Sequence, residues 1–260
     1  MSYQGGKQRL GKRIFKVLNK LDTTQLDYLE PFVGFCGVMK HFGNKGDRKL
    51  MGRDINKDVI AMWKATQQGW NPPMTCSKEK YKELRDDPRT SAERGFIGVA
   101  CSYSGIFFVG YRGKQTFRNK SKNGKVKSTV VESAAMTARS VNRMAKMLKN
   151  VDFKACKYQS LNPKNMLVYC DPPYASNDYK QNKYFNFDSK EFWGIIRKWS
   201  NDNIVVVSEY KAPSDFREIW QSKNDVIHHG KRNIKIEKLF IHKNLYDSIS
   251  EETKTKIRQI

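Results

Sequence analysis

The chain has 260 residues, of which 38% are hydrophobic and 12% aromatic. That is enough apolar material for a folded core, so the composition argues against a disordered chain. The 49 lysines and arginines outnumber the 26 acidic residues and give a net charge of +23. This excess favours a polyanionic partner such as nucleic acid, although a Lys-rich proteome would also explain it.

The spacing of the cysteines and the composition of the N-terminal residues narrow the class of protein further. Five cysteines are scattered without a Cys-x-x-Cys pair, and the four histidines show no metal-ligand spacing. We therefore expect no metal site and a reducing compartment, the cytoplasm. The first residues are polar and glycine-rich, unlike a signal peptide, and no apolar run approaches the length of a membrane span.

Helical and strand patterns alternate over the first 70 residues. Apolar side chains recur at helical spacing up to Leu21, and residues 26–32 read as a short buried strand. A turn and a helix through residues 38–42 follow. A second strand at residues 49–53 leads into a helix over residues 58–68. This order begins a nucleotide-binding α/β unit.

The pattern changes after the Asn-Pro-Pro sequence at residues 71–73. Residues 74–150 mix charged helical stretches with a glycine- and aromatic-rich run over residues 95–113. Residues 112–127 contain seven basic side chains and no acid. We predict that residues 72–150 form an inserted lobe.

The α/β pattern returns near residue 151. It predicts an edge strand within residues 152–159, a buried strand at 165–170, a helix over 190–200 and a buried parallel-type strand at 204–207. Two further strands are expected within residues 225–244. Residues 1–71 and 151–260 would thus form one α/β domain around the insert.

The strongest chemical signal is Asp171-Pro172-Pro173-Tyr174, which follows a predicted strand. Open α/β sheets place ligands at the carboxyl ends of their strands. The amino nitrogen of adenine is a poor nucleophile, and a carboxylate with a rigid backbone carbonyl can orient it by accepting its N–H groups. The proline pair stiffens the turn, and the tyrosine ring can stack on an extruded base. The alternative is an Asp-capped Pro-Pro turn without function.

Three weaker signals come from the first strand units. Glu30-Pro31-Phe32-Val33-Gly34 begins a glycine turn that would let the backbone approach a cofactor, although a turn without ligand is about as frequent. Asp54 ends the second strand and could accept hydrogen bonds from ribose hydroxyls, or could merely cap the next helix. Lys7 could pair with a carboxylate of a cofactor or of the protein, or belong to a loose basic end.

The predicted insert combines aromatic and basic side chains. Aromatic rings beside lysines and arginines suit a hairpin that grips phosphates and inserts into stacked bases. The alternative is a small core with a solvated basic rim, and both can hold. The aromatic residues are Phe96, Tyr103, Phe107, Phe108, Tyr111 and Phe117. The candidate DNA-binding residues are Tyr103, Arg112, Lys114, Arg118, Lys120 and Lys122.

Taken in order, these residues resemble the Dam-like (D12 class) adenine-N6 DNA methyltransferases. The resemblance rests on Gly5-Gly6-Lys7, the turn at residues 30–34, the run at residues 100–105 and the Asp-Pro-Pro-Tyr motif. It implies a Rossmann-like methyltransferase fold that depends on S-adenosylmethionine. Its mixed, mostly parallel sheet would have one antiparallel strand near the C-terminus, and the insert would recognise the target. Transfer to a flipped adenine in double-stranded DNA would need no metal.

The resemblance also implies roles for individual residues. Tyr3 and Lys7 would contact S-adenosylmethionine, Asp54 would bind its ribose, and Asp171 would touch both cofactor and target amine. Glu30, Phe32 and Gly34 belong to the cofactor turn. The family often has Phe-x-Gly-x-Gly, whereas Cys36 occupies the second glycine position here. Either Cys36 takes a costly positive φ or the turn shifts onto Gly37.

Several alternatives stay open. The same machinery could act on cytosine N4 or on adenine in RNA, although Asp171 favours adenine and the insert favours duplex DNA. The chain could be an inactive DNA-binding relative. A dehydrogenase is disfavoured because the pyrophosphate motif Gly-x-Gly-x-x-Gly is missing at residues 34–39. The recognition sequence, a companion restriction nuclease, the oligomeric state and a cellular or viral origin are left undetermined.

Overall fold

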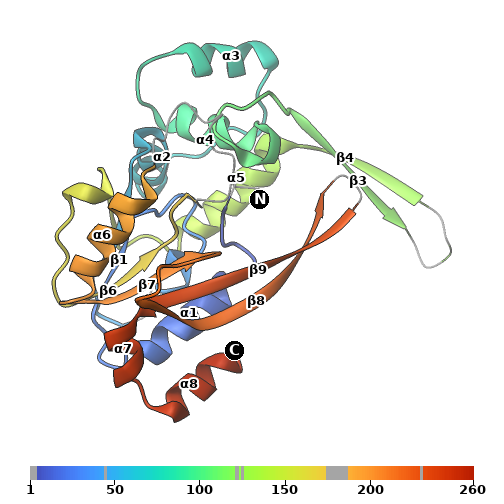
Figure 1. Cartoon of the computed structure of the whole chain (residues 1–260). Helices are drawn as coiled ribbons and strands as arrows, with labels where there is room; N and C mark the ends of the chain where they lie inside the picture. Colours follow the sequence, from blue (N-terminus) through green and yellow to red (C-terminus); the bar gives the residue numbers. More distant parts are fainter. Residues whose placement is uncertain (1–4, 44–45, 121–122, 124–125, 174–186, 229–230) are drawn as a thin grey trace.

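The computed structural model describes residues 5–43, 46–120, 123, 126–173, 187–228 and 231–260 (Figure 1). Within them a seven-stranded sheet has the order β5-β2-β1-β6-β7-β9-β8, and β3 and β4 form a separate two-stranded sheet. The strands are β1 (Asp27–Glu30), β2 (Leu50–Asp54), β3 (Lys114–Lys120), β4 (Val126–Glu132), β5 (Val151–Ala155), β6 (Met166–Cys170), β7 (Ile204–Glu209), β8 (Phe216–His228) and β9 (Lys231–His242).

The helices are α1 (Gly11–Leu21), α2 (Lys57–Gln67), α3 (Lys78–Asp86), α4 (Ala92–Ala100), α5 (Ser133–Ala145), α6 (Ser189–Trp199), α7 (Lys243–Ser248) and α8 (Glu251–Arg258). Single 3₁₀ turns occur at η1 (Met39–His41), η2 (Tyr103–Gly105) and η3 (Tyr158–Ser160). The predicted helix through residues 38–42 is therefore only one 3₁₀ turn. The short helices α7 and α8 were not predicted.

The large sheet is mixed and mostly parallel, as predicted. Strands β5, β2, β1, β6 and β7 pair in parallel, and β9 runs antiparallel to both β7 and β8. Strand β5 lies at one edge of the sheet, where residues 152–159 were expected to place a strand. The C-terminal hairpin is longer than predicted because β8 already begins at Phe216.

The central strand β6 is buried on both faces of the sheet, and successive side chains of a strand point to opposite faces. Along β6, Leu167 and Tyr169 join one apolar cluster, whereas Val168 and Cys170 join the other. Helices α1, α2, α4 and α5 contribute to the first cluster, and α6 contributes to the second. The continuous apolar run of β6 thus reflects a central strand covered from both sides.

The segment between α2 and β5 packs partly on the main sheet unit and partly projects from it. Helix α4 lies against α2, where a side chain at Gly95 would collide with the backbone oxygen of Asp58. Arg94 forms an ion pair with the buried Asp58 carboxylate. The β3–β4 hairpin extends away from these helices (Figure 1).

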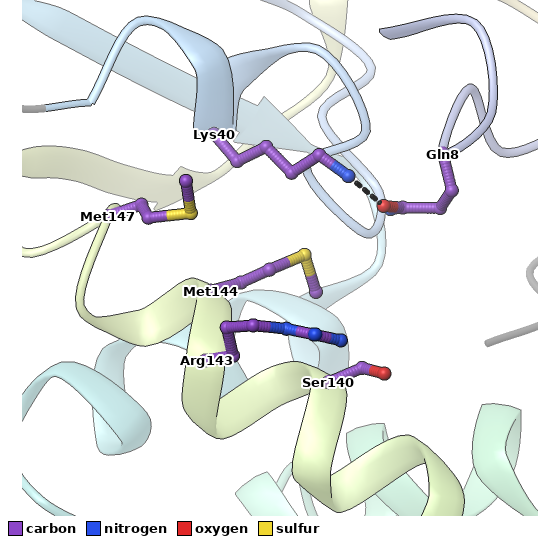
Figure 2. A pocket seen from close by; sticks show the side chains of 6 residues that line it. All are labelled: Gln8, Lys40, Ser140, Arg143, Met144 and Met147. Carbon is purple, nitrogen blue, oxygen red and sulfur yellow. Dashed lines mark hydrogen bonds between the residues drawn. The ribbon is translucent and has the colours of Figure 1, made fainter. Parts of the chain in front are cut away.

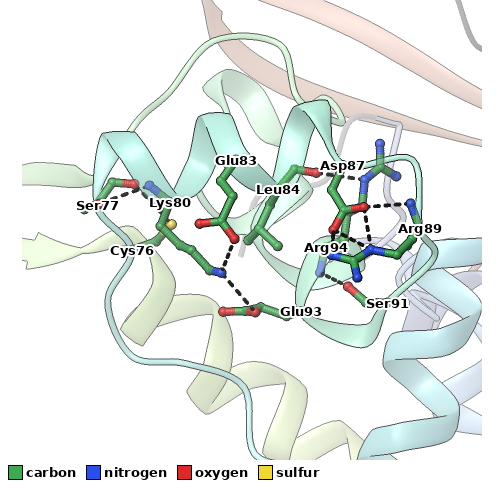
Figure 3. A network of polar contacts seen from close by, with 10 residues as sticks. All are labelled: Cys76, Ser77, Lys80, Glu83, Leu84, Asp87, Arg89, Ser91, Glu93 and Arg94. Atoms are coloured by element: carbon green, nitrogen blue, oxygen red, sulfur yellow. Dashed lines mark hydrogen bonds and ion pairs between the residues drawn. The ribbon is translucent and has the colours of Figure 1, made fainter.

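Helices α3 and α4 are joined by polar contacts (Figure 3). Arg94 Nε donates to the Leu84 carbonyl at 2.8 Å, and Lys80 Nζ lies 2.9 Å from Glu83 and 4.0 Å from Glu93. Ser77 and Ser91 cap the two helices by accepting backbone N–H groups. These contacts fix the orientation of α3 on α4.

Candidate active site

The candidate residues converge at the carboxyl ends of three neighbouring parallel strands. Strand β1 lies between β2 and β6, with Glu30 opposite Gly52 and Leu29 opposite Val168. The turn that begins at Glu30, the carboxylate of Asp54 and the Asp171 corner therefore emerge at the same sheet edge. Adjacent strands are only about 4.8 Å apart, so the three features lie side by side.

Lys7 joins the N-terminal segment to this edge. Its Nζ lies 2.6 Å from Asp171 Oδ1 and 3.6 Å from Glu237 Oε1, and it donates to the Gly5 carbonyl at 3.0 Å. Burial disfavours the charged ammonium, but the two carboxylates outweigh that effect and raise the pKa of Lys7. Of the three options for Lys7, the structure shows pairing with carboxylates of the protein.

Glu30 is buried beside this pair, at the end of β1. The Tyr28 hydroxyl donates to Glu30 Oε1 at 2.6 Å. Burial is the main reason why the pKa of Glu30 rises to about 8; the charge of Asp171 adds to the rise, whereas hydrogen bonds from Tyr28 and the Met39 amide oppose it. Burial thus favours the neutral form of the Glu30 carboxyl, next to an ionic one.

The turn after β1 has two residues in the left-handed region. Gly34 has φ 42° and Cys36 has φ 54°, whereas Gly37 does not have a positive φ. Cys36 therefore takes the positive φ itself, and the turn does not shift onto Gly37. Gly37 allows the close approach of two backbone segments, because a Cβ there would lie 3.0 Å from the backbone of Lys7.

Hydrogen bonds hold the turn from both sides. The Gly34 amide donates to Asp54 Oδ2 at 2.9 Å, and the Trp63 indole donates to the Gly34 carbonyl at 2.8 Å. Asp54 Oδ1 accepts the Asn56 amide at 2.9 Å, but Asn56 itself caps α2. Burial raises the pKa of Asp54, and the backbone N–H groups partly offset it. Asp54 is thus a turn-organising carboxylate and not the cap of α2.

An aromatic cluster lies beside the Asp171 corner. The Phe32 ring is 5.2 Å from the ring of Tyr158 and 5.9 Å from that of Phe192. Tyr158 is buried, and its hydroxyl has no hydrogen-bond partner among the described residues. Pro172 is buried and Pro173 half-buried; Tyr174 lies outside the described residues, as does Tyr3.

Three residues at this edge escaped the sequence analysis: Tyr28, Tyr158 and Glu237. Tyr28 and Glu30 are two positions apart on a strand, a spacing that places them on one face and could have indicated their contact. Glu237 lies in β9 and reaches Lys7 only through folding of the C-terminal hairpin. No local pattern around Glu237 marks it.

The aromatic residues of residues 72–150 divide into two groups. Phe96, Phe107 and Phe108 are buried and Tyr111 is half-buried, as a small core requires. Tyr103 and Phe117 are 58% and 42% exposed. The small core is therefore confirmed for the buried rings, and contact of the two exposed rings with DNA stays a prediction.

The basic candidates are spread over the segment that leads into the hairpin and the hairpin itself. Lys114 and Arg118 lie on β3, with Lys114 Nζ 3.4 Å from Glu132 Oε1 on β4. Arg112 precedes the hairpin and is half-buried. Lys120 ends β3, but its side chain lies outside the described residues, and so does Lys122.

The sequence profile of the D12 class N6 adenine-specific DNA methyltransferases matches residues 3–236. The chain belongs to this family. It is therefore an enzyme that transfers a methyl group from a donor to N6 of adenine in DNA, and its sheet is that of a Rossmann-like methyltransferase fold. None of the curated proteins matches the chain.

Two further observations concern membranes and metals. No helix in the described parts of the chain is long and apolar enough to cross a membrane. Within the same residue ranges, no three His, Cys, Asp or Glu side chains gather in a way that could hold a metal ion.

Proposed function

We propose that this methyltransferase uses S-adenosylmethionine and modifies an adenine turned out of duplex DNA. The observation that carries the proposal is the convergence of Asp171, Lys7 and the Gly34 turn at one sheet edge. Parallel α/β sheets bind nucleotide-like ligands at this edge, and the family implies a methyl donor.

The residues at the edge fit the cofactor. Asp54 Oδ2 accepts the Gly34 amide and Oδ1 the Asn56 amide, and the Ile55 amide also interacts with this carboxylate. A carboxylate has about four lone-pair sites, so an acceptor site remains for a ribose hydroxyl. The next residue, Ile55, is 44% exposed and offers apolar surface to an aromatic base. When bound, S-adenosylmethionine supplies an electrophilic methyl group on its sulfonium sulfur.

Asp171 and its neighbours prepare the acceptor. The Asp171 carboxylate and the Pro172 carbonyl each accept one N–H of the adenine amino group and so direct the nitrogen lone pair toward the donor. Lys7 stays within 2.6 Å of Asp171 and keeps this carboxylate oriented. In the proposal Pro173 fixes the turn and Tyr174 stacks on the extruded base. Phe32 closes the apolar side of the site.

Residues 72–150 act as the target-recognition lobe in this proposal. The exposed rings of Tyr103 and Phe117 and the basic side chains around β3 suit contact with phosphates and stacked bases. Arg112, Lys114, Arg118, Lys120 and Lys122 would neutralise backbone phosphates, helped by basic residues of the C-terminal hairpin.

The test is methyl transfer to duplex DNA followed by digestion to nucleosides. We expect N6-methyl-2′-deoxyadenosine as the product; N4-methyl-2′-deoxycytidine, or transfer to RNA only, would contradict the proposal. Asp171→Ala should reduce methyl transfer by at least about 100-fold, because the preorganised carboxylate that stabilises the positive charge developing on the amino nitrogen is lost. The affinity for DNA should stay near that of the wild type. Asp171→Asn keeps the volume of the side chain and checks that the loss is not due to unfolding.

Asp202→Ala is the matched control. Asp202 also pairs with a lysine, Lys164, but lies on the surface beyond α6. This variant should retain full turnover. Turnover by Asp171→Ala at the wild-type rate would refute the assigned role.

A further inference from the structure

A pocket separate from the Asp171 corner lies between the N-terminal segment, η1 and α5 (Figure 2). Its volume is about 310 Å³. Gln8 comes from the segment that carries Lys7, and Lys40 from η1, just after the cofactor turn. The lining is completed by Ser140, Arg143 and Met144 of α5 and by Met147, just beyond the C-terminal end of that helix.

The pocket has two cationic side chains and no acid in its lining. Lys40 Nζ donates to Gln8 Oε1 at 2.5 Å. Arg143 is exposed, and Figure 2 shows no hydrogen bond between it and the other lining residues. Burial lowers the pKa of Lys40, and the charge of Arg143 lowers it further against the opposing influence of Cys36. Two like charges are held together here without a counter-charge, so an anion would be stabilised between them.

The two halves of the lining differ in chemistry. Lys40, Arg143 and the Ser140 hydroxyl offer hydrogen-bond donors, although Ser140 now donates to the Met136 carbonyl at a long 3.3 Å. Met144 and Met147 form an apolar wall, and Met147 is 38% exposed. Donors beside an apolar wall suit a phosphate that carries a sugar better than they suit a free phosphate ion.

We propose that this pocket binds one phosphate of the DNA backbone together with its deoxyribose. The Lys40 ammonium and the Arg143 guanidinium would both contact the phosphate, and the methionine wall would contact the sugar. This proposal rests on the proposed function, since it assigns the DNA substrate of the same enzyme a contact outside the hairpin.

The position of the pocket connects DNA binding with the cofactor turn. Gln8 Nε2 donates to the Phe35 carbonyl at 2.7 Å while Gln8 Oε1 accepts from Lys40. Helix α5 follows β4 of the hairpin directly in the chain. A phosphate held by Lys40 and Arg143 would therefore bridge the element that leaves the hairpin and the turn that precedes η1.

The experiment measures how the affinity for a fluorescent DNA duplex depends on salt. For Lys40→Gln/Arg143→Gln, the slope of log K against log salt concentration should become shallower by about 1, the value for one lost phosphate contact. The single variants should lose affinity non-additively, because both side chains act on the same phosphate. Arg143→Gln alone keeps the test valid if the double variant folds poorly, since Arg143 is exposed.

Lys198→Gln is the control for the loss of one positive charge, as in the single variants. Lys198 is exposed on α6, which covers the opposite face of the sheet, so this variant should leave the slope unchanged. An unchanged slope in the double variant would overturn the proposal, and so would an equal decrease in the control. Additive losses with a slope change of about 2 would also overturn it, because they indicate two separate phosphates.

Two further measurements separate the possible reasons for failure. Calorimetric titration with inorganic phosphate tests the other source of the ligand. Binding that is lost in the double variant while its DNA slope is unchanged would assign the pocket to free phosphate and overturn the DNA contact. If the wild-type chain methylates adenine while the salt slopes of the wild type and the double variant are equal, only the pocket assignment fails. If the wild type makes no methyladenine, the proposed function fails.

Discussion

At the residue scale, Cys36 is the clearest departure from the family pattern. It has φ 54° and is completely buried. The positive φ strains the backbone and destabilises the fold, whereas the packing of the buried side chain stabilises it. A left-handed conformation costs an L-residue about 1–2 kcal/mol, which glycine avoids. The buried sulfur explains how the position tolerates a residue other than glycine.

Substitution of Cys36 separates these two contributions. Cys36→Gly should change the free energy of unfolding by less than about 1 kcal/mol, because relief of strain offsets the lost packing. Cys36→Val should destabilise by more than about 2 kcal/mol, since a β-branched side chain at positive φ is a steric outlier. Urea unfolding measures both changes. Equal stability of the valine variant and the wild type would contradict the left-handed turn.

Glu30 leads to a pH prediction at the same scale. Burial holds its folded-state pKa at about 8, above the ordinary 4.5. The folded state therefore keeps a proton that the unfolded state releases, so this contribution to stability is present below pH 4.5 and is lost as the pH rises toward 8. Relative to Glu30→Gln, the wild type should lose stability by a few kcal/mol (on the order of 1.4 kcal/mol per pKa unit) over that range.

The measurement is urea unfolding of both proteins at several pH values. The difference between wild type and variant cancels the titration of other groups. A difference that is constant from pH 5 to pH 8 would show that Glu30 is ionised in the folded protein.

At the element scale, the β3–β4 hairpin presents apolar residues on an exposed strand pair. Phe117 is 42% exposed and Val130 61% exposed, and the two occupy adjacent register positions. Exposed apolar groups beside basic side chains have no role in the core, which supports their assignment to DNA.

Phe117→Ala should weaken DNA binding by about 1–3 kcal/mol, the value of one lost stacking contact. The free energy of unfolding should change by less than about 0.5 kcal/mol, because the ring is exposed. Fluorescence anisotropy and thermal unfolding give the two quantities. Met74→Ala, which removes another exposed apolar side chain before α3, should affect neither. Unchanged DNA affinity of the Phe117 variant would argue against stacking by the hairpin.

At the scale of the whole molecule, the net charge of +23 is the dominant property. Self-repulsion destabilises the folded chain, and a bound polyanion relieves it. Duplex DNA at about 100 times its dissociation constant should add about 2.7 kcal/mol of stability at low salt. This corresponds to a rise in melting temperature of about 5–10 °C.

High salt should remove most of this rise, because counterions released from the DNA gain less entropy in a concentrated salt solution and the affinity falls. Thermal unfolding with and without DNA, at low and at high salt, measures the effect. A rise that is independent of salt would show that charge does not drive the association.

The amino-acid sequence alone determined the α/β order and the acids at strand ends, because these follow from local periodicity and the direction of parallel strands. The mixed sheet with one antiparallel strand was implied by the family resemblance. The five apolar residues of β6 and the motif that begins at Asp171 are examples. The division of the chain at residues 72–150 stays a prediction, and their recognition role stays a proposal.

Only the tertiary structure decided which side chains meet across long stretches of chain. Lys7 and Asp171 are 164 positions apart, and Glu237 joins them from the C-terminal hairpin. The sequence alone also left three further features undetermined: which aromatic rings are buried and which exposed, the positive φ of Cys36, and the helices α7 and α8. Each depends on packing against distant elements, where burial and charge pairing outweigh local preference.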